Sequence, residues 1–503
     1  MSYILYQVFF HPLAKYPGPF LAKLTNFYSV YHAAKGDRHF DLYELHLKHG
    51  PIVRWGPSHL SFCSVSALET VYGHNANVQK GSWYQVTYGH SIFNVVDKAI
   101  HARKKRVMSQ AFSDKAIRGM EPHILSAIRV WSENLGNDNT PSKDLSKIDS
   151  IGENSWTAPK DMSDHAAYMI FDVLGEICFG ETFGTAINTA NRYFLELMKD
   201  HISLINTLGQ APILHQFNLV DLFMRNKKEL RKKQLVFSRQ QLQKRLAMGT
   251  TSNRKDIIYY LQEAKDPETG EGYSQAELMY ETTLLLGAGA ETANTTLSSI
   301  FYFLVKHPDV LQRLTDTIRD AFPDVESIAS GPVLNSMVFL RACIDECLRI
   351  CPPVPMPLPR EVLAGGIVID GHYVPQGCTV GVPTYTLHHD EDYFDNPFEY
   401  NPNRWLVHGT HGVFDGEGRT AGQVAKARQA FAPFSVGPRA CIGRSVALLE
   451  LYIGVARTIW LYDIRMAPGS ENVGVGRGGE YKTEDHFVVH KQGPILQFRK
   501  AKH

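Results

Sequence analysis

The sequence contains no long uninterrupted hydrophobic run. Residues 1–10 are apolar and uncharged, but His11 and Pro12 follow at once. A membrane-spanning helix needs about 20 predominantly apolar residues, so this segment is too short to cross a bilayer. It also lacks the positively charged start of a signal peptide. We therefore expect no secretory leader and no complete transmembrane anchor in this sequence.

The sequence also lacks an excess of positive or negative charge. The chain has 52 Lys and Arg residues against 51 Asp and Glu residues, a net charge of +1. Nucleic-acid-binding proteins need a basic surface, so this balance argues against that class. The basic run at 227–233 is spaced like the solvated face of a helix. We expect no nucleic-acid partner.

Cysteines are few, with seven in 503 residues at irregular spacing. An odd, scattered set excludes a disulfide-rich scaffold and fits a reducing compartment. Cys343, Cys347 and Cys351 would share one helix face, but no second pair completes a structural zinc site, so we interpret them as packing residues. Linkers and internal repeats are also missing, which favours one domain despite the length.

Hydrophobic periodicity predicts a mainly α fold with small β-sheets. Helices are expected at 100–112, 120–134, 162–179, 190–205, 219–248, 274–305, 310–321 and 335–350. Strands are expected at 52–55, 60–64, 366–369, 373–374, 379–382, 462–466 and 487–489. The run 474–479 fits the letters G-x-G-x-x-G, but a strand pattern follows it instead of the helix that a dinucleotide site needs. A Rossmann-type oxidoreductase is therefore only a distant alternative.

The most informative motif surrounds Cys441. Phe434, Gly437, Arg439, Cys441 and Gly443 fill the pattern F-x-x-G-x-R-x-C-x-G. Gly437 allows a turn that a Cβ would block. Backbone N–H groups of an apolar helix expected to begin near Gly443 would stabilise a thiolate and lower the pKa of the thiol. A buried structural cysteine before a helix is the alternative interpretation.

This loop resembles the haem-binding loop of the cytochrome P450 family. The resemblance implies that Cys441 is the axial ligand of haem b iron, and thiolate ligation favours O–O bond cleavage. It implies further that Arg439 pairs with a haem propionate. Phe434 would pack near the sulfur and limit the access of water.

A second motif lies in the helix expected at 274–305. Gly287 and Gly289 each cost about 0.5–1 kcal/mol relative to alanine in a helix interior, a cost we attribute to close passage over a flat cofactor. The run around them resembles the family's oxygen-activation motif. It implies that Thr292 hydrogen-bonds dioxygen and that Glu291 relays protons, although Ala293 lacks the usual second hydroxyl.

Two further groups of charged residues carry the resemblance. Glu346 and Arg349 form an E-x-x-R pattern on one side of a helix, and with Arg404 they resemble the family's structural triad, which fixes the cysteine loop. Trp405 stands where many members have phenylalanine. Arg360 would pair with a haem propionate, with a plain salt bridge as the alternative.

His101 and Lys105 occupy the positions where many members have W-x-x-x-R, and Arg106 is adjacent. The propionate contact is therefore assigned to Lys105 or Arg106, beside His101. A solvated basic face, or a docking patch for a redox partner, is as consistent with this pattern.

The resemblance extends from a proline hinge near Pro17 to Gly493-Pro494. It implies the cytochrome P450 fold, a helix-rich triangular prism with haem between a long distal helix and a proximal helix that carries the cysteine. Residues 1–19 would be the remnant of an anchor and its hinge, and 20–503 one catalytic domain. The implied location is the cytosolic face of the endoplasmic reticulum membrane.

The implied activity is haem-thiolate monooxygenation, the insertion of one oxygen atom of O₂ into a hydrophobic organic substrate. Details at 358–362, 371–375 and 401–405 resemble filamentous-fungal members of the benzoate-hydroxylase-like and secondary-metabolite type. The sequence shows no flavin domain, so electrons would come from an NADPH–cytochrome P450 reductase, with cytochrome b5 as a further donor. The protein is expected to act as a monomer.

The same resemblance places the substrate against 82–97, 202–217, 284–292, 354–359 and the turn near His490. Trp83, Tyr84, Tyr88 and Phe93 suit a flat or hydrophobic substrate. Lys98 is the only nearby fixed cation in this prediction, which leaves an aromatic-acid hydroxylase as a less favoured alternative. The apolar stretch 212–223 is expected to enter the membrane.

Two other functions stay open at this point. An oxidative-coupling, isomerising or dehydrating enzyme would use the same loop without oxygen insertion, although Glu291 and Thr292 argue against an O₂-independent reaction. A haem sensor would bind haem without reductase-supported turnover.

Overall fold

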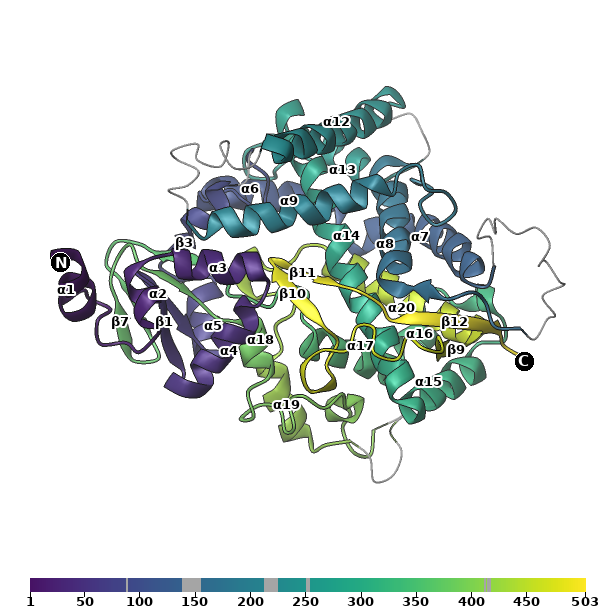
Figure 1. The fold of residues 1–503 in the computed structure, drawn as a ribbon. Coiled ribbons are helices and arrows are strands. Elements are labelled where there is room, and N and C mark those ends of the chain that lie inside the picture. Colours follow the sequence, from purple (N-terminus) through teal and green to yellow (C-terminus); the bar gives the residue numbers. More distant parts are fainter. Residues whose placement is uncertain (87–88, 138–154, 212–224, 250–253, 411–412, 414–417) are drawn as a thin grey trace.

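The computed structural model describes residues 1–86, 89–137, 155–211, 225–249, 254–410, 413 and 418–503. Helices dominate, and the small sheets lie near the start of the chain and after residue 360, which confirms the predicted fold class. In Figure 1 the long helix α14 crosses the centre of the molecule, and the N-terminal helices with β1 form one end.

Helix α14 (Gln275–Lys306) is the central element of the helical part. Ser274 and Glu277 form a capping box at its start, so both side chains satisfy N–H groups that the helix leaves unpaired. A Cβ on Gly289 would lie 2.8 Å from the Leu174 side chain, and one on Gly287 would lie 2.7 Å from Met198. Both glycines thus allow close packing of α14 against neighbouring side chains, and their predicted passage over a cofactor stays a prediction.

Most of the remaining helices of this part lie around α14, and α19 lies apart from it (Figure 1). They are α6 (Lys98–Ala111), α7 (Asp114–Leu135), α8 (Met162–Leu174), α9 (Tyr193–Gly209), α12 (Arg225–Ala247), α13 (Ile257–Glu263), α15 (Pro308–Ala321), α16 (Pro332–Asn335), α17 (Val338–Ile350), α18 (Thr384–His388), α19 (Ala421–Ala430) and α20 (Arg444–Leu461). The prediction of a helix from residue 120 was wrong at its start, because Ser113 caps α7.

The largest sheet joins segments from both ends of the chain. Its order is β1 (Ile52–Gly56), β2 (His59–Phe62), β8 (Thr379–Gly381), β5 (Arg360–Val362), β3 (Val78–Lys80). Sequence analysis did not predict β3 or β5. Their antiparallel register places Lys80 opposite Arg360, so the sheet brings two cations together.

The smaller sheets hold the C-terminal segments. They are β4 (Lys160–Asp161), β12 (Ile495–Lys500) and β9 (Tyr462–Met466); β10 (Thr483–His486) and β11 (Val488–Lys491); and β6 (Ile367–Ile369) and β7 (His372–Val374). The glycine run at 474–479 forms turns ahead of β10, and no α-helix follows it there, which agrees with the interpretation as a loop.

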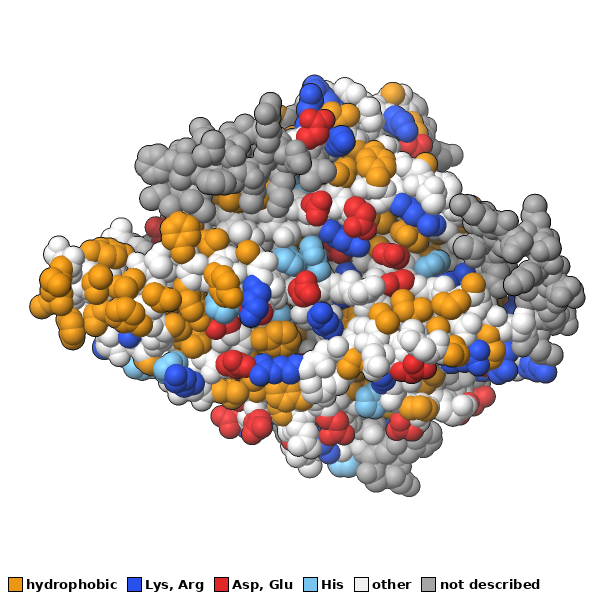
Figure 2. All heavy atoms as spheres, viewed as in Figure 1, with side chains coloured by type: hydrophobic (Ala, Val, Ile, Leu, Met, Phe, Trp, Pro, Cys, Tyr) orange, Lys and Arg blue, Asp and Glu red, His pale blue; other side chains and the backbone are white. Residues whose placement is uncertain are grey.

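The N-terminal end is richer in helix than expected. It holds α1 (Ser2–Leu5), a π-helical turn (Tyr6–Phe10), α2 (Phe20–Leu24), α3 (Phe27–Lys35), α4 (Arg38–His49) and α5 (Val65–Tyr72). Hydrophobic side chains are exposed along its outer surface, where Figure 2 shows them gathered: Tyr3, Ile4, Leu5, Tyr6, Phe9, Phe10, Phe20 and Leu21. Among the described residues, no helix combines the length and hydrophobicity needed to cross a membrane.

Candidate active site

Cys441 lies between a short 3₁₀ turn (Gly437–Arg439) and helix α20. Its backbone N–H donates to the carbonyl oxygen of Phe434 at 2.9 Å, which closes the loop on itself. The other six cysteines are buried, whereas Cys441 is exposed. The loop therefore presents this thiol to its surroundings.

The pKa of the Cys441 thiol is set by two opposing effects. Solvent reaches the side chain, yet dense protein atoms around it raise the thiol pKa above its usual value of 9.0. N–H groups of Gly443 and Arg444 at the helix start lower the pKa but do not outweigh burial. The predicted lowering of the thiol pKa by N–H groups at the helix start is thus present, although burial outweighs it.

Gly437 is needed by the loop for two reasons. Its φ is +72°, in the left-handed region that side chains disfavour. A Cβ there would also lie 2.0 Å from the carbonyl oxygen of Tyr72. The glycine therefore lets the cysteine loop pass directly against the end of α5.

A cavity of about 500 Å³ beside the loop is lined by basic side chains. We call it the cation cavity; its charged or basic lining residues are His74, Lys80, Lys98, His101, Lys105, Arg106, Arg360 and Arg439. No aspartate or glutamate belongs to the described lining. Burial, followed by the nearby cations, lowers the pKa of His101 to about 3, so this histidine is neutral. The site is built for an anion.

The structure separates the two candidates at 105–106. Lys105 Nζ donates to the Pro438 carbonyl oxygen at 2.7 Å, within the cysteine-loop turn. Arg106 binds both carboxylate oxygens of Asp266, at 2.6 and 2.9 Å. Its charge is therefore already balanced, and Lys105 is the better candidate for an anion in the cavity.

Arg360 and Arg439 also line the cation cavity. Arg439 donates to the backbone oxygens of Val95 and Val96, at 2.7 and 3.0 Å, and Arg360 contacts the Tyr84 hydroxyl at 3.2 Å. Sequence analysis missed Lys80, which is buried and donates to a backbone oxygen. Only the β3–β5 pairing reveals it.

These residues fit a haem group. A free cysteine preceding a helix supplies the thiolate donor that haem iron takes, and basic side chains in a cavity whose described lining holds no carboxylate suit two propionates. Haem bound here would supply the activation of dioxygen. Cys441 would hold it, with Arg360, Arg439, Lys105 and Lys80 toward the propionates.

Glu291 on α14 has a partner that sequence analysis missed. Its Oε2 lies 3.1 Å from Lys491 Nζ on β11, and both side chains are buried. Burial alone would raise the pKa of Glu291, but Lys491 and then Lys199 bring it below the usual 4.5. Oε1 has no partner among the described residues, whereas Thr292 donates to its own helix at Ala288, at 2.9 Å.

A second cavity, of about 450 Å³, lies on the α14 side; we call it the distal cavity. Helix α14 contributes Leu284, Gly287 and Ala288, and the 82–97 segment contributes Trp83 and Phe93. Of the predicted substrate segments, 354–359 lines another cavity, and Phe487 and Val488 line the distal cavity in place of His490. Tyr88 and the stretch 212–223 lie outside the described residues.

Glu346, Arg349 and Arg404 meet in a buried ion cluster. Glu346 Oε1 accepts from Arg349 Nη2 at 2.8 Å and from Arg404 Nε at 2.9 Å. Trp405 Nε1 donates to Glu346 Oε2 at 2.9 Å, a contact that phenylalanine cannot make. The Trp405 ring also packs 4.7 Å from that of Phe431, just before the cysteine loop.

Comparison with known proteins agrees with this geometry. The cytochrome P450 family model matches residues 16–478. Cytochrome P450 monooxygenase poxM of Penicillium oxalicum is 35% identical over 99% of this chain and 92% of its own length. AKT7 of Alternaria alternata is 35% identical over 99% and 95%, and atnE of Emericella nidulans 33% identical over 98% and 93%; both are named cytochrome P450 monooxygenases. The chain belongs to the cytochrome P450 family and is a haem-thiolate monooxygenase.

Proposed function

We propose that the protein inserts one oxygen atom of O₂ into a hydrophobic small molecule of fungal secondary metabolism. The distal cavity carries this proposal, because aromatic and aliphatic side chains predominate in its wall and its α14 lining ends at Ala288, one helical turn before Thr292. Such a cavity removes a hydrophobic substrate from water next to the oxygen-handling residues. The fungal relatives support the biological setting.

The chain's own residues would handle substrate and protons. Lys491 holds Oε2 of Glu291, so the unpartnered Oε1 is the atom that would accept and pass on a proton. The Thr292 hydroxyl would leave its bond to Ala288 to position dioxygen. The proposed cofactor is haem b held by Cys441. Electrons would come from an NADPH–cytochrome P450 reductase, with cytochrome b5 as a further donor, and the protein would act as a monomer.

Attachment to the cytosolic face of the endoplasmic reticulum membrane belongs to the same proposal. The exposed hydrophobic residues of α1 and the adjoining turn support it, because a surface of this kind favours contact with lipid. Flotation of the full chain with neutral and anionic vesicles tests it. If Phe9→Ser with Phe10→Ser floats as well as the native chain, this surface does not bind membranes.

The carbon monoxide difference spectrum of the reduced protein tests the central claim. We expect a strongly red-shifted Soret band that disappears in Cys441→Ala. Cys378→Ala is the matched control, because Cys378 is buried away from the loop and should leave the band unchanged. A band at the shorter wavelength of neutral ligation in the native protein would contradict the thiolate assignment, and turnover without NADPH or O₂ would contradict oxygen insertion.

A further inference from the structure

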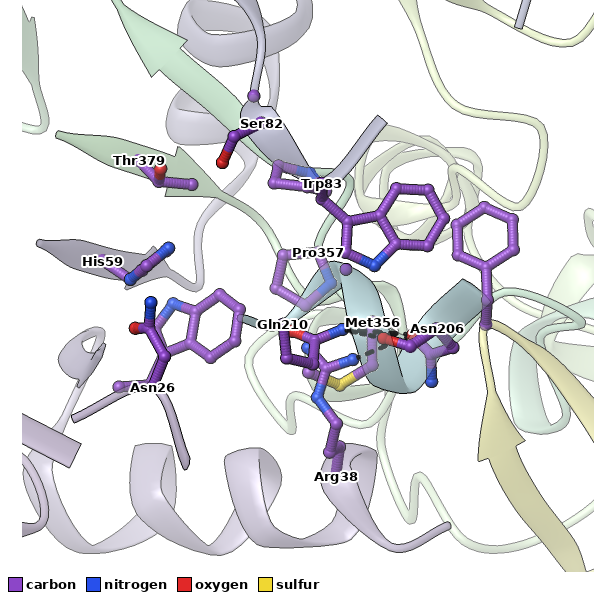
Figure 3. A pocket seen from close by; sticks show the side chains of 15 residues that line it. Asn26, Arg38, His59, Ser82, Trp83, Asn206, Gln210, Met356, Pro357 and Thr379 are labelled. Atoms are coloured by element: carbon purple, nitrogen blue, oxygen red, sulfur yellow. Dashed lines mark hydrogen bonds between the residues drawn. The ribbon is translucent and has the colours of Figure 1, made fainter. Parts of the chain in front are cut away.

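A third cavity, of about 70 Å³, lies next to the distal cavity and has a different character. We call it the polar cavity. Figure 3 shows Arg38 rising from α4 toward Asn206 and Gln210, with His59 and Thr379 on neighbouring strands across from them. Trp83 and Phe487 line both this cavity and the distal cavity. Their stacked rings, 4.7 Å apart, therefore form a shared wall.

Buried hydrogen-bond donors of the polar cavity lack acceptors. Arg38 Nε, Asn206 Nδ2 and Trp55 Nε1 have no partner among the described residues, although Arg38 is only 5% exposed and Asn206 only 1%. A buried donor without an acceptor costs about 1–3 kcal/mol. His59 Nδ1 in the lining and Asp485 Oδ2 beside Arg38 are unpartnered as well. The three donors nevertheless form a site that can receive an acceptor from outside the chain.

The orientation of the Asn206 amide is fixed by its neighbours. Its Oδ1 accepts from Arg38 Nη1 at 3.3 Å and from Gln210 Nε2 at 3.2 Å. Gln210 in turn accepts from the Ser29 hydroxyl at 3.2 Å. Because both donors bind the amide oxygen, Nδ2 must point away from them and stay available.

The charges around the cavity favour a neutral occupant. Arg38 Nη1 lies 3.7 Å from Asp485 Oδ2, and both side chains are buried. The two formal charges cancel, so an added carboxylate would be a buried anion without its own counter-ion, which is costly. A neutral carbonyl oxygen accepts from the same donors without that cost.

We propose that the polar cavity binds a neutral carbonyl group of the substrate, while the hydrophobic remainder lies along the Trp83 and Phe487 rings toward the distal cavity. Arg38 and Asn206 are the donors to the carbonyl oxygen. The inference rests on the proposed monooxygenase function and adds a substrate class to it. It also supplies a polar anchor that Lys98, the cation considered from the sequence, does not provide, since Lys98 lines the cation cavity instead.

Calorimetric titration of the purified haem-containing protein with three matched probes tests the proposal. Benzylacetone carries the carbonyl, butylbenzene replaces it with a methylene, and hydrocinnamate replaces the terminal methyl with a charged oxygen. We expect benzylacetone to bind about tenfold more tightly than butylbenzene, the gain from one or two net hydrogen bonds. Hydrocinnamate should bind no more tightly than benzylacetone.

Two variants locate the effect. Asn206→Asp keeps the acceptor for Arg38 but removes the free donor, and Arg38→Met removes the guanidinium; either should abolish the tenfold preference and leave butylbenzene binding unchanged. Asn206→Asp preserves size, so it keeps the test valid if Arg38→Met does not fold. Thr379→Val, a polar change in the same wall, is the control and should retain the preference.

Equal binding of benzylacetone and butylbenzene to the native protein would overturn the proposal and indicate that the cavity holds water only. Tighter binding of hydrocinnamate would overturn it in favour of an anion site. An unchanged preference in Asn206→Asp would exclude Asn206 as a donor and overturn it too. A normal carbon monoxide spectrum of the same preparation would show that only this inference had failed, and not the monooxygenase function.

Discussion

The ion cluster behind the cysteine loop and the polar cavity differ in how their buried polar atoms are paired. Around Glu346, both carboxylate oxygens accept from named donors on α17 and the 401–405 segment. In the polar cavity, donors on α4, β1 and α9 lack acceptors. The part that holds the cysteine is thus completed by the chain itself, whereas the polar cavity keeps unused hydrogen-bonding capacity.

We expect the largest loss of stability from Glu346→Ala. Losing one member of a buried ion pair costs about 3–5 kcal/mol, and here two buried arginines lose their carboxylate. We expect a loss of at least that size in urea unfolding, together with poor haem retention. The control is Glu181→Gln, whose exposed pair with Lys244 is worth about 0–1 kcal/mol. Equal effects in the two variants would contradict the importance of the buried cluster.

Lys491→Met breaks a buried ion pair on the distal side, and the resulting loss of unfolding free energy should depend on pH. It leaves Glu291 buried without its cation, which should cost about 3–5 kcal/mol at neutral pH. In the native protein the lowered pKa of Glu291 contributes stability that is present above its usual 4.5 and lost as pH falls through the folded value. In the variant the folded pKa should rise above 4.5, so the difference in unfolding free energy should shrink from pH about 7 toward about 5.

Urea unfolding of both proteins across this pH range measures that difference. Lys244→Met, on an exposed ion pair, should show a small and pH-independent change. A difference that grows as the pH falls would show that Glu291 does not depend on Lys491 for its charge.

Gly437→Ala tests how rigidly the cysteine loop is seated. A left-handed alanine together with overpacking against Tyr72 is expected to cost about 2–5 kcal/mol. Gly371→Ala separates the two contributions, because Gly371 has a φ of +78° but no atom within 4 Å of a Cβ. Its cost should be limited to about 1–2 kcal/mol. Thermal unfolding and haem content measure both, and equal losses would mean that the close approach to Tyr72 is not restrictive.

We expect a smaller loss of stability from Trp405→Phe. It removes one donor to a buried carboxylate while Arg349 and Arg404 stay in place, so the expected loss is about 1.5–3 kcal/mol. Trp460→Phe is the control, because its indole N–H donates to a neutral backbone oxygen at 3.1 Å and should cost about 0.5–1.5 kcal/mol. A neutral result for Trp405→Phe would show that the two arginines suffice for Glu346.

Sequence patterns correctly predicted the features that lie within one continuous segment of the chain. The cysteine loop and the E-x-x-R pair lie in continuous motifs, and periodicity predicted α14 almost to its ends. Helices α3 and α4 were not predicted, although both are amphipathic; α3 has only nine residues and α4 only twelve. Strands β3 and β5 are only three residues each, too short to show an alternation.

The partners that complete the site could not be predicted, because each comes from a distant segment. Lys491 reaches Glu291 across 200 residues, and Arg38 reaches Asn206 across 168. A lysine in a strand or an arginine at a helix start is ordinary by itself, and only tertiary packing places it beside its partner. Trp405 is similar, since its indole nitrogen matters only once it lies within reach of Glu346.

The shared wall of Trp83 and Phe487 has a consequence for which carbon is oxidised. If the carbonyl of a substrate is held in the polar cavity, the rest of the molecule extends along the two rings toward α14 from a fixed starting point. Homologous substrates of increasing length would then be oxidised at a constant number of bonds from the carbonyl, while the position counted from the far end would change. The distance from the polar cavity would then determine which carbon of the substrate is oxidised.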